Sequence, residues 1–379
     1  MKICHIITRL ILGGAQENTI LTCEGLHNRG HDVTLVTGPA LGPEGELLTR
    51  ARSGGYRVVV LDALRREINP WRDWQSYRQI CRFLAADRPD VMHSHSSKAG
   101  IIARRAAAKV GGMKIVHTIH GLPYHRYQAA WRNWLYITLE KAGARRSDAI
   151  ISVADAMTKQ ALEAGVGMSG QYRTIYSGME ADVYSKRPKG AGEFRASLNL
   201  PGDAVLVTQV ARLAELKGHE YIIEAAGRID DPRVHFCFVG DGHWRGRIEA
   251  DIASRGLSDR FHLTGLVPPD YVPTVLHTSD ILVHCSLREG LARALPQGML
   301  AGLPVISFDV DGAREVVDET TGVLLVPKDV DGLTAAIARL AGDNVQRATL
   351  GDTGRKRCTE MFSHHKMVDE IEKLYESLD

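Results

Sequence analysis

The sequence lacks the features that would place it across a membrane or outside the cell. No apolar run approaches the roughly 20 residues that a membrane-spanning helix needs. The apolar start at residues 1–7 is short and leads into Gly13-Gly14 rather than a cleavage site, so we expect a first strand and not a signal peptide. The six cysteines are scattered without a Cys-x-x-Cys pair. This argues against a zinc site and favours reduced thiols in a cytoplasmic protein.

Charge is spread unevenly, although the net charge of the 379 residues is only +2. Residues 1–178 contain 24 Lys and Arg against 14 Asp and Glu, a net charge of +10. Residues 179–379 contain 23 against 31, a net charge of −8. This asymmetry favours an anionic partner for the first half, or two domains whose surfaces differ and attract each other. The length itself suits two domains of ordinary size.

Strand and helix patterns alternate along the chain, and the alternation restarts after a polar stretch at 184–192. Its Pro, Gly and Lys residues suit an exposed linker. The repeated pattern predicts two α/β domains, 1–183 and 184–363, each a Rossmann-like doubly wound parallel sheet. Strands are expected at 3–7, 32–37, 56–61, 91–95, 114–119, 149–153, 205–210, 234–239, 261–264, 281–285, 305–308 and 323–326. Helices are expected at about 16–28, 71–88, 99–110, 131–144, 220–228 and 364–378.

The most informative segment is 286–306, which begins with a polar loop containing one carboxylate, Glu289. The loop joins an apolar strand to a helix of small residues with Pro296 in its first turn. In parallel sheets, ligands bind at the carboxyl ends of strands, and a helix N-terminus there favours an anion. We therefore expect Glu289, in the loop, and Gln297, just inside the helix, near a bound anion. An ordinary strand–helix unit with a solvated glutamate is the alternative.

The spacing of Glu289 and Gln297 resembles the glutamate–seven residues–glutamate signature of retaining nucleotide-sugar glycosyltransferases of family four. The resemblance implies that Glu289, with Gly290 and Leu291 after it, contacts the donor sugar. Gln297 replaces the second glutamate, so its ribose contact would use an uncharged amide. The resemblance covers nearly the whole chain and implies the GT-B fold, two Rossmann-like domains facing a cleft. It also implies that a C-terminal helix, 364–379, packs back on the first domain.

A second motif, at 210–219, follows the first strand of the second half. It resembles the Arg-Leu…Lys-Gly motif of the same family, which implies that Arg212 and Lys217 hold the donor diphosphate. Two fixed cations stabilise the leaving group without a metal. Solvated charges at a helix start are the alternative. Gly265 and Leu266 occupy the place where backbone groups of the family contact the nucleobase.

The first half contributes residues at the ends of three predicted strands. His120 aligns with the active-site histidine of the family, and a histidine there can bind a hydroxyl or carry a proton. Gly13 and Gly14 resemble the glycine loop that faces the donor phosphates and the acceptor, and a tight turn without a ligand is the alternative. Their spacing does not fit a dinucleotide fingerprint. His95 and Lys98 are candidates for the acceptor side.

We therefore expect a metal-independent retaining glycosyltransferase without a cofactor, whose catalytic residues are His120, Arg212, Lys217 and Glu289. A UDP-sugar is the favoured donor and GDP-mannose the alternative. A glycan or a lipid-linked molecule is the expected acceptor, in the biosynthesis of cell-surface polysaccharide or glycolipid. A nucleotide-sugar epimerase of the same fold and a non-catalytic sugar-binding protein are the rival interpretations.

Aromatic and cationic residues alternate at 123–136 within the basic first half. Such a segment favours peripheral contact with the inner face of the membrane. A helix that packs its aromatic residues on the core is the alternative. No nucleic-acid partner is expected.

Overall fold

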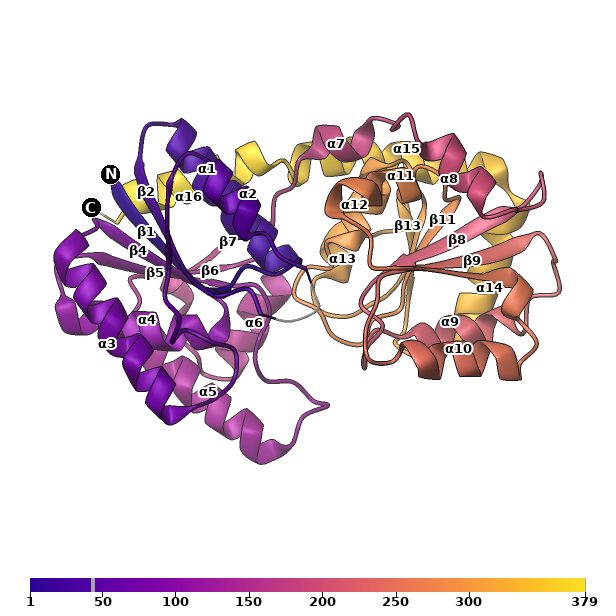
Figure 1. Ribbon diagram of the computed structural model, residues 1–379. Helices are drawn as coiled ribbons and strands as arrows, with labels where there is room; N and C mark the ends of the chain where they lie inside the picture. The colour runs from indigo at the N-terminus through magenta and orange to yellow at the C-terminus, as the bar shows by residue number, and fades with distance from the viewer. Residues whose placement is uncertain (42–44, 379) are drawn as a thin grey trace. The chain divides into compact units, whose positions relative to one another are not determined.

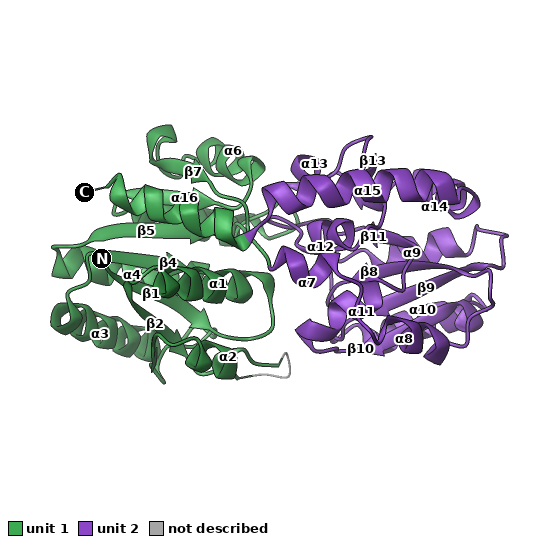
Figure 2. Ribbon diagram, turned by 90° about the horizontal axis from the view of Figure 1, so that it is seen from above, with its two compact units in different colours: residues 1–179, 364–379 green, residues 180–363 purple. Residues whose placement is uncertain are grey.

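The computed structural model describes residues 1–41 and 45–378, which form two compact α/β units (Figure 1). Unit 1 comprises residues 1–179 and 364–379, and unit 2 comprises residues 180–363 (Figure 2). Unit 2 is thus an insertion between two segments of unit 1. The backbone N–H of His364 donates to the carbonyl of Met179 at 3.0 Å, which joins the two segments where the chain returns.

The start of unit 2 is a pair of short helices rather than an open linker. The boundary expected after residue 183 lies inside α7 (Ala181–Ser185), which belongs wholly to unit 2. The polar stretch 184–192 runs from the end of α7 into α8 (Ala191–Ser197). Its Pro and Gly residues therefore mark the turn between these two helices.

Unit 1 is built on a seven-stranded parallel sheet in the order β3-β2-β1-β4-β5-β6-β7. The strands pair in parallel throughout because every connection is a helical or loop crossover. The elements are β1 (Lys2–Arg9), α1 (Gly14–Asn28), β2 (Asp32–Gly38), α2 (Leu48–Ser53), β3 (Arg57–Val60), α3 (Pro70–Asp87), β4 (Val91–His95), α4 (Ser97–Val110), β5 (Lys114–Ile119), α5 (Ala130–Ala144), β6 (Ala149–Ser152), α6 (Asp155–Glu163), β7 (Tyr172–Thr174) and α16 (His364–Glu376).

Helices cover both faces of this sheet, so its central strands are buried on both sides. On one face, Ile20 of α1 and Val368 of α16 join a core with Ile3 and Ile7 of β1. On the other face, α3 and α4 pack over residues such as Ile6. The C-terminal helix is therefore a structural part of unit 1.

Unit 2 repeats the design with a six-stranded parallel sheet in the order β10-β9-β8-β11-β12-β13. A core of apolar side chains from β8, β9, β11, α9 and α14 fills its interior. The remaining elements are β8 (Val205–Val210), α9 (His219–Ala226), β9 (Val234–Val239), α10 (Arg245–Ser254), β10 (Phe261–Gly265), α11 (Val272–Leu276), β11 (Ile281–His284), α12 (Ala294–Leu300), β12 (Val305–Phe308), α13 (Ala313–Val316), β13 (Gly322–Leu325), α14 (Val330–Gly342) and α15 (Asn344–Met361).

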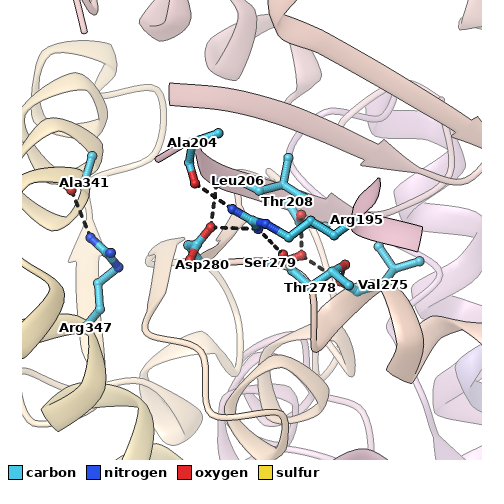
Figure 3. Close-up of polar contacts among 10 residues, drawn as sticks. All are labelled: Arg195, Ala204, Leu206, Thr208, Val275, Thr278, Ser279, Asp280, Ala341 and Arg347. Carbon is cyan, nitrogen blue, oxygen red and sulfur yellow. Dashed lines mark hydrogen bonds and ion pairs between the residues drawn. The ribbon is translucent and has the colours of Figure 1, made fainter. Parts of the chain in front are cut away.

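A polar network fixes the amino ends of β8 and β11 (Figure 3). Arg195 of α8 donates to the carbonyls of Ala204 and Thr278, both at 2.6 Å, and lies 3.2 Å from the Asp280 carboxylate. Asp280 also accepts the backbone N–H of Leu206 at 2.8 Å. These bonds lie at the opposite ends of the strands from the loops that carry the predicted ligand contacts.

The secondary-structure expectations hold for the named strands and helices, with shifts of one to two residues at their ends. Both units have the predicted doubly wound parallel sheet. Across residues 1–41 and 45–378, no helix is both long enough and apolar enough to cross a membrane. All six cysteines are free thiols.

Candidate active site

In unit 2, the loops that follow β8 and β11 lie against each other at the carboxyl edge of the sheet. β8 has β9 on one side and β11 on the other, so the chain connections diverge there, as at the ligand crevice of doubly wound sheets. The backbone N–H of Leu287 donates to the carbonyl of Leu216 at 2.8 Å. Gly218 has φ +75°, and a Cβ built on it would lie 1.9 Å from the carbonyl oxygen of Cys285. Glycine is therefore required where the two loops meet.

This loop contact brings Lys217 and Glu289 together, although they are far apart in the sequence. Lys217 Nζ lies 2.5 Å from Glu289 Oε1, and His284 Nε2 lies 3.2 Å from the same oxygen. The Gln209 amide donates to the carbonyl of Lys217 at 2.9 Å, and the Asp311 carboxylate accepts the backbone N–H of Glu289 at 2.6 Å. Both members of the pair are therefore held by their own backbone as well as by each other.

The Glu289 carboxyl of this pair is ionised at neutral pH. Burial alone would raise the pKa of the Glu289 carboxyl, but Lys217 and His284 favour its charged form and hold the pKa well below its usual range. The side chains remain partly accessible, at 20% for Lys217 and 16% for Glu289. An ionised carboxylate can accept hydrogen bonds from hydroxyl groups, and an ammonium beside it can bind phosphate oxygens.

The other predicted residues of unit 2 lie around this pair in different ways. Arg212 is exposed, and within the described residues its side chain makes no ion pair. Gly290 and Leu291 are buried directly after Glu289. Gln297 is 8% exposed, and its amide nitrogen donates to the Tyr184 hydroxyl at 2.8 Å. Sequence reasoning did not identify Tyr184, because its contact with α12 spans more than a hundred residues of chain.

Gly265 and Leu266 lie at the end of β10, at the same carboxyl edge. The backbone N–H of Gly240, at the end of β9, donates to the carbonyl of Gly265 at 3.0 Å. Gly265 is buried and Leu266 is 50% exposed, so this turn presents an apolar side chain to solvent.

Unit 1 contains a pocket of about 260 Å³ at the carboxyl ends of β4 and β5. His120 and Gly121 line it together with Ser96, Ser97 and Ala15. The wall of the pocket is mostly apolar with a few polar groups such as Ser96 and His120, which is the usual composition of a small-molecule site.

Three predicted residues of unit 1 lie beside this pocket rather than in its wall. Gly13 and Gly14 precede Ala15, where the glycine loop enters α1, and the Gly13 carbonyl accepts the backbone N–H of Glu17 at 3.0 Å. Lys98 forms an ion pair with Asp73 of α3 at 2.6 Å. The structure therefore assigns Lys98 a contact between α3 and α4.

His95 is fully buried and contacts His120 directly. His95 Nδ1 lies 3.1 Å from His120 Nε2, and His95 Nε2 lies 3.0 Å from His5 Nδ1. His93 also lies in this cluster, between the Tyr375 hydroxyl and the Thr118 hydroxyl, which is 2.7 Å away. Burial lowers the pKa of His5 to about 3. Sequence reasoning missed His5 and His93, although their pairing on adjacent parallel strands is the signal that could have revealed them.

The cluster has the composition of a metal site but is already hydrogen-bonded. Ligand atoms of His5, His93 and His95 lie within 4.8 Å of one another. Both ring nitrogens of His93 and both of His95 already have hydrogen-bond partners. A bound metal would have to break these bonds, so the donor set fits a hydrogen-bond network better than a metal centre.

Comparison with known structures identifies the fold. The crystal structure of Anabaena HepE in complex with UDP-glucose matches with a TM-score of 0.86 at 21% identity, over 100% of both chains. That of WaaG, described as a glycosyltransferase involved in lipopolysaccharide biosynthesis, matches with a TM-score of 0.76 at 17% identity, over 97% of this chain and 99% of WaaG. The fold is therefore the two-domain GT-B fold.

Sequence comparison gives the family. The family described as "Glycosyl transferase 4-like domain" matches residues 13–178, and the family described as "Glycosyl transferases group 1" matches residues 191–357. Because the two matches together span most of both units, this chain belongs to the family-four type of glycosyltransferases.

Two relatives illustrate the range of the family. An Escherichia coli protein named UDP-Gal:alpha-D-GlcNAc-diphosphoundecaprenol alpha-1,3-galactosyltransferase is 26% identical over 99% of this chain and 96% of its own length. A Streptomyces fradiae protein named 2-deoxystreptamine N-acetyl-D-glucosaminyltransferase is 30% identical over 69% of this chain and 64% of its own length.

Proposed function

We propose that this glycosyltransferase moves a sugar from a UDP-sugar to a lipid-linked or glycan acceptor, with retention of configuration and without a metal or cofactor. The observation that carries the proposal is the Lys217–Glu289 pair at the carboxyl edge of unit 2. It combines a cation that can hold a diphosphate with a carboxylate that can hold sugar hydroxyls.

The residues suggest how the transfer would proceed. The bond between C1 of the sugar and the diphosphate oxygen breaks, and Lys217 and Arg212 stabilise the charge that develops on the leaving diphosphate. The acceptor oxygen bonds to C1 on the face that the diphosphate leaves, and the acceptor proton passes to a diphosphate oxygen. Glu289 binds donor hydroxyls rather than attacking C1, because its carboxylate is engaged by Lys217 and lies beside His284.

Features of the relatives favour particular substrates. The E. coli relative is named for a UDP-sugar donor and a lipid diphosphate acceptor, and the HepE structure is a complex with UDP-glucose. A UDP-sugar is therefore a better candidate donor than GDP-mannose. A lipid-linked acceptor is a better candidate than an aminocyclitol, since this chain covers 96% of the E. coli relative and only 64% of the 2-deoxystreptamine enzyme. We place the reaction in cell-surface polysaccharide or glycolipid biosynthesis.

Nucleotide binding gives the first test. Thermal unfolding would be measured with UDP, GDP, ADP and dTDP, each with and without magnesium. A ligand at about 100 times its Kd adds about 2.7 kcal/mol to the free energy of unfolding. We expect UDP to stabilise the protein equally with and without magnesium. Stabilisation by GDP alone would replace the donor, and stabilisation only with magnesium would contradict the metal-independent mechanism.

Replacement of Lys217 tests the site itself. Lys217→Ala removes a cation from the leaving group, so we expect transfer from the UDP-sugar to fall by about 100-fold or more. Lys186→Ala is the matched control, because Lys186 is 78% exposed and its ion pair is with exposed Asp182. Near-normal transfer by the folded Lys217→Ala protein would remove Lys217 from the mechanism. A new sugar nucleotide formed without acceptor would identify an epimerase, and nucleotide binding without any turnover would identify a binding protein.

Exposed tryptophans in unit 1 support the additional proposal that the enzyme contacts an anionic membrane surface. Trp71 and Trp74 lie in the first turns of α3 and are 63% and 45% exposed, and Trp131 and Trp134 in the first turns of α5 are 64% and 69% exposed. Both helices begin at the carboxyl edge of the sheet and flank α4.

Arginines accompany these rings. The guanidinium of Arg78 lies 4.8 Å from the centre of the Trp74 ring, and that of Arg132 lies 5.2 Å from the Trp131 ring. Tryptophan at the lipid interface with arginine near anionic headgroups is the combination that peripheral membrane proteins use.

Vesicle sedimentation tests this surface. We expect binding to vesicles that contain anionic lipid and weaker binding to neutral vesicles, with a decrease as salt is raised. Serine at Trp71, Trp74, Trp131 and Trp134 should remove most of the binding. Val326→Ser/Val345→Ser is the control, because these side chains are 72% and 71% exposed in unit 2. Equal binding by the tryptophan variant and the control would contradict the proposal.

A further inference from the structure

Three histidines form a hydrogen-bonded row from the interior of unit 1 to its pocket. His5 of β1 contacts His95 of β4 at 3.0 Å between Nδ1 and Nε2. His95 contacts His120, directly after β5, at 3.1 Å between Nδ1 and Nε2. His5 and His95 are fully buried, whereas His120 lines the pocket.

The number of protons on the three rings limits the possible hydrogen-bond directions along this row. A neutral imidazole has one N–H donor and one acceptor nitrogen. Burial lowers the pKa of His5 to about 3 and that of His95 well below its usual value, so each has one proton near neutral pH. Every N···N contact needs one donor and one acceptor. The donors must therefore all point outward, toward His120, or all inward, toward His5.

The nitrogen at the inner end of the row, His5 Nε2, distinguishes the outward arrangement from the inward one. His5 Nε2 is buried and has no hydrogen-bond partner among residues 1–41 and 45–378. With inward donors, His5 would hold its proton on this nitrogen, which leaves an unpaired N–H in the core. With outward donors, the same nitrogen has only a lone pair. Buried N–H groups without a partner are rarer in proteins than under-satisfied acceptors, so the outward arrangement is favoured.

We propose that the protons are ordered outward, with His5 Nδ1–H donating to His95 Nε2 and His95 Nδ1–H donating to His120 Nε2. The neutral His120 ring then has its own proton on Nδ1, and its Nε2 lone pair is occupied. His120 therefore meets a ligand as a hydrogen-bond donor and not as a base, and His5 and His95 are positioning residues. Its use on a donor sugar rests on the proposed function, whereas the proton order does not.

Nitrogen NMR of the full chain, labelled with ¹⁵N-histidine, tests the order directly, because the two tautomers of neutral histidine have different nitrogen shifts. The signal lost in His120→Gln identifies His120. We expect the wild-type ring to be protonated on Nδ1 without any ligand present. An Nε2–H tautomer of His120 in the wild type would overturn the proposal.

Two replacements of His95 separate positioning from folding. His95→Leu removes the donor to His120, so we expect the tautomer ratio to shift about tenfold toward Nε2–H. His95→Asn places an amide donor near the former Nδ1 and should restore the Nδ1–H tautomer. Unchanged tautomers in His95→Leu would show that His95 does not set the state of His120. A cooperative thermal unfolding transition would verify that each variant is folded.

The same variants distinguish this inference from the proposed function. If transfer takes place, His95→Leu should lower kcat by about tenfold more than His95→Asn does, with little change in the KM for the donor. The NMR experiment needs no substrate. A failure of sugar transfer would therefore leave the proton order standing, and an incorrect proton order would leave nucleotide binding by unit 2 intact.

Discussion

Arg104 and Glu140 form a buried ion pair in unit 1, with 2.7 Å between Arg104 Nη2 and Glu140 Oε2. Their side chains are only 1% and 5% exposed. Arg104 is further fixed by its donation to the Gly100 carbonyl at 2.9 Å, and Gly143 leaves just enough space for the guanidinium. Desolvation makes such a pair costly to separate, because either charge alone would remain in a low-dielectric interior.

Loss of one partner should therefore destabilise the protein strongly. We expect Glu140→Leu to lower the free energy of unfolding by about 3–5 kcal/mol in urea titrations, because Arg104 is left buried and unpaired. The double variant Arg104→Met/Glu140→Leu should recover much of this loss. Asp182→Ala breaks an exposed pair with Lys186 and should change stability by no more than about 0.5 kcal/mol. Equal effects for Glu140→Leu and Asp182→Ala would contradict this account.

Single residues also show how far the site could be read from the sequence. Lys217 and Glu289 were each predicted from a local motif, and their 2.5 Å contact depends on two loops meeting across the sheet. The bond between Gln297 and Tyr184 depends in the same way on long-range packing. Local patterns identify the type of side chain at a strand end, but they do not give its partner. The assigned roles of these residues in transfer stay predictions.

At the scale of elements, the loop between β8 and α9 is fitted tightly to the end of β11. Leu216 has φ +65° and Gly218 φ +75°, and these two turns bring the backbone beside Cys285. The Lys217 ammonium depends on this path for its position. A change in backbone spacing here therefore acts on both the stability of unit 2 and the geometry of the ion pair.

Gly218→Ala should show both effects. A positive φ costs alanine about 1–2 kcal/mol, and the contact with the Cys285 carbonyl should add about 1–3 kcal/mol. Gly256→Ala is the matched control, because Gly256 has φ +68° and no atom of the described residues lies within 4 Å of the added Cβ. We expect Gly218→Ala to lose more stability in denaturant titrations, together with UDP-dependent thermal stabilisation. If both variants kept UDP-dependent stabilisation, the loop would not be needed for the nucleotide.

The elements themselves differ in how well the sequence predicts them. Central strands such as β5 and β9 are buried almost throughout and rich in apolar residues, and their bounds were predicted to the residue. β7 was missed because it is a three-residue edge strand with one exposed position and no apolar run. α7 was not predicted, and its last two residues fell in the expected linker at 184–192, since a helix of five residues leaves little periodicity to detect.

For the whole molecule, buried histidines link stability to pH. Burial lowers the pKa of His5 to about 3, and those of His93, His95 and His117 well below the usual value. In the unfolded chain these groups take up protons below about pH 6.5. The unfolded state then binds more protons than the folded state, so the free energy of unfolding decreases as pH falls through this range.

We expect chemical denaturation between pH 6.5 and 5 to show this loss. Each buried histidine should contribute a slope of up to about 1.4 kcal/mol per pH unit. His117→Gln should reduce the total slope by up to that amount, whereas His243→Gln, at an exposed position, should leave it unchanged. Stability independent of pH between 7.5 and 5 would show that these histidines are not buried in neutral form.

The return of α16 to unit 1 has a consequence for biosynthesis. A ribosome makes all of unit 2 before it makes residues 364–378, yet Met367, Val368, Ile371 and Leu374 complete the core of unit 1. The nascent unit 1 therefore has an uncovered apolar groove along α1 until the inserted unit has emerged and α16 has been made. During that interval the groove exposes apolar surface of the kind that makes nascent chains prone to aggregate, and synthesis that stops before residue 364 would leave it uncovered permanently.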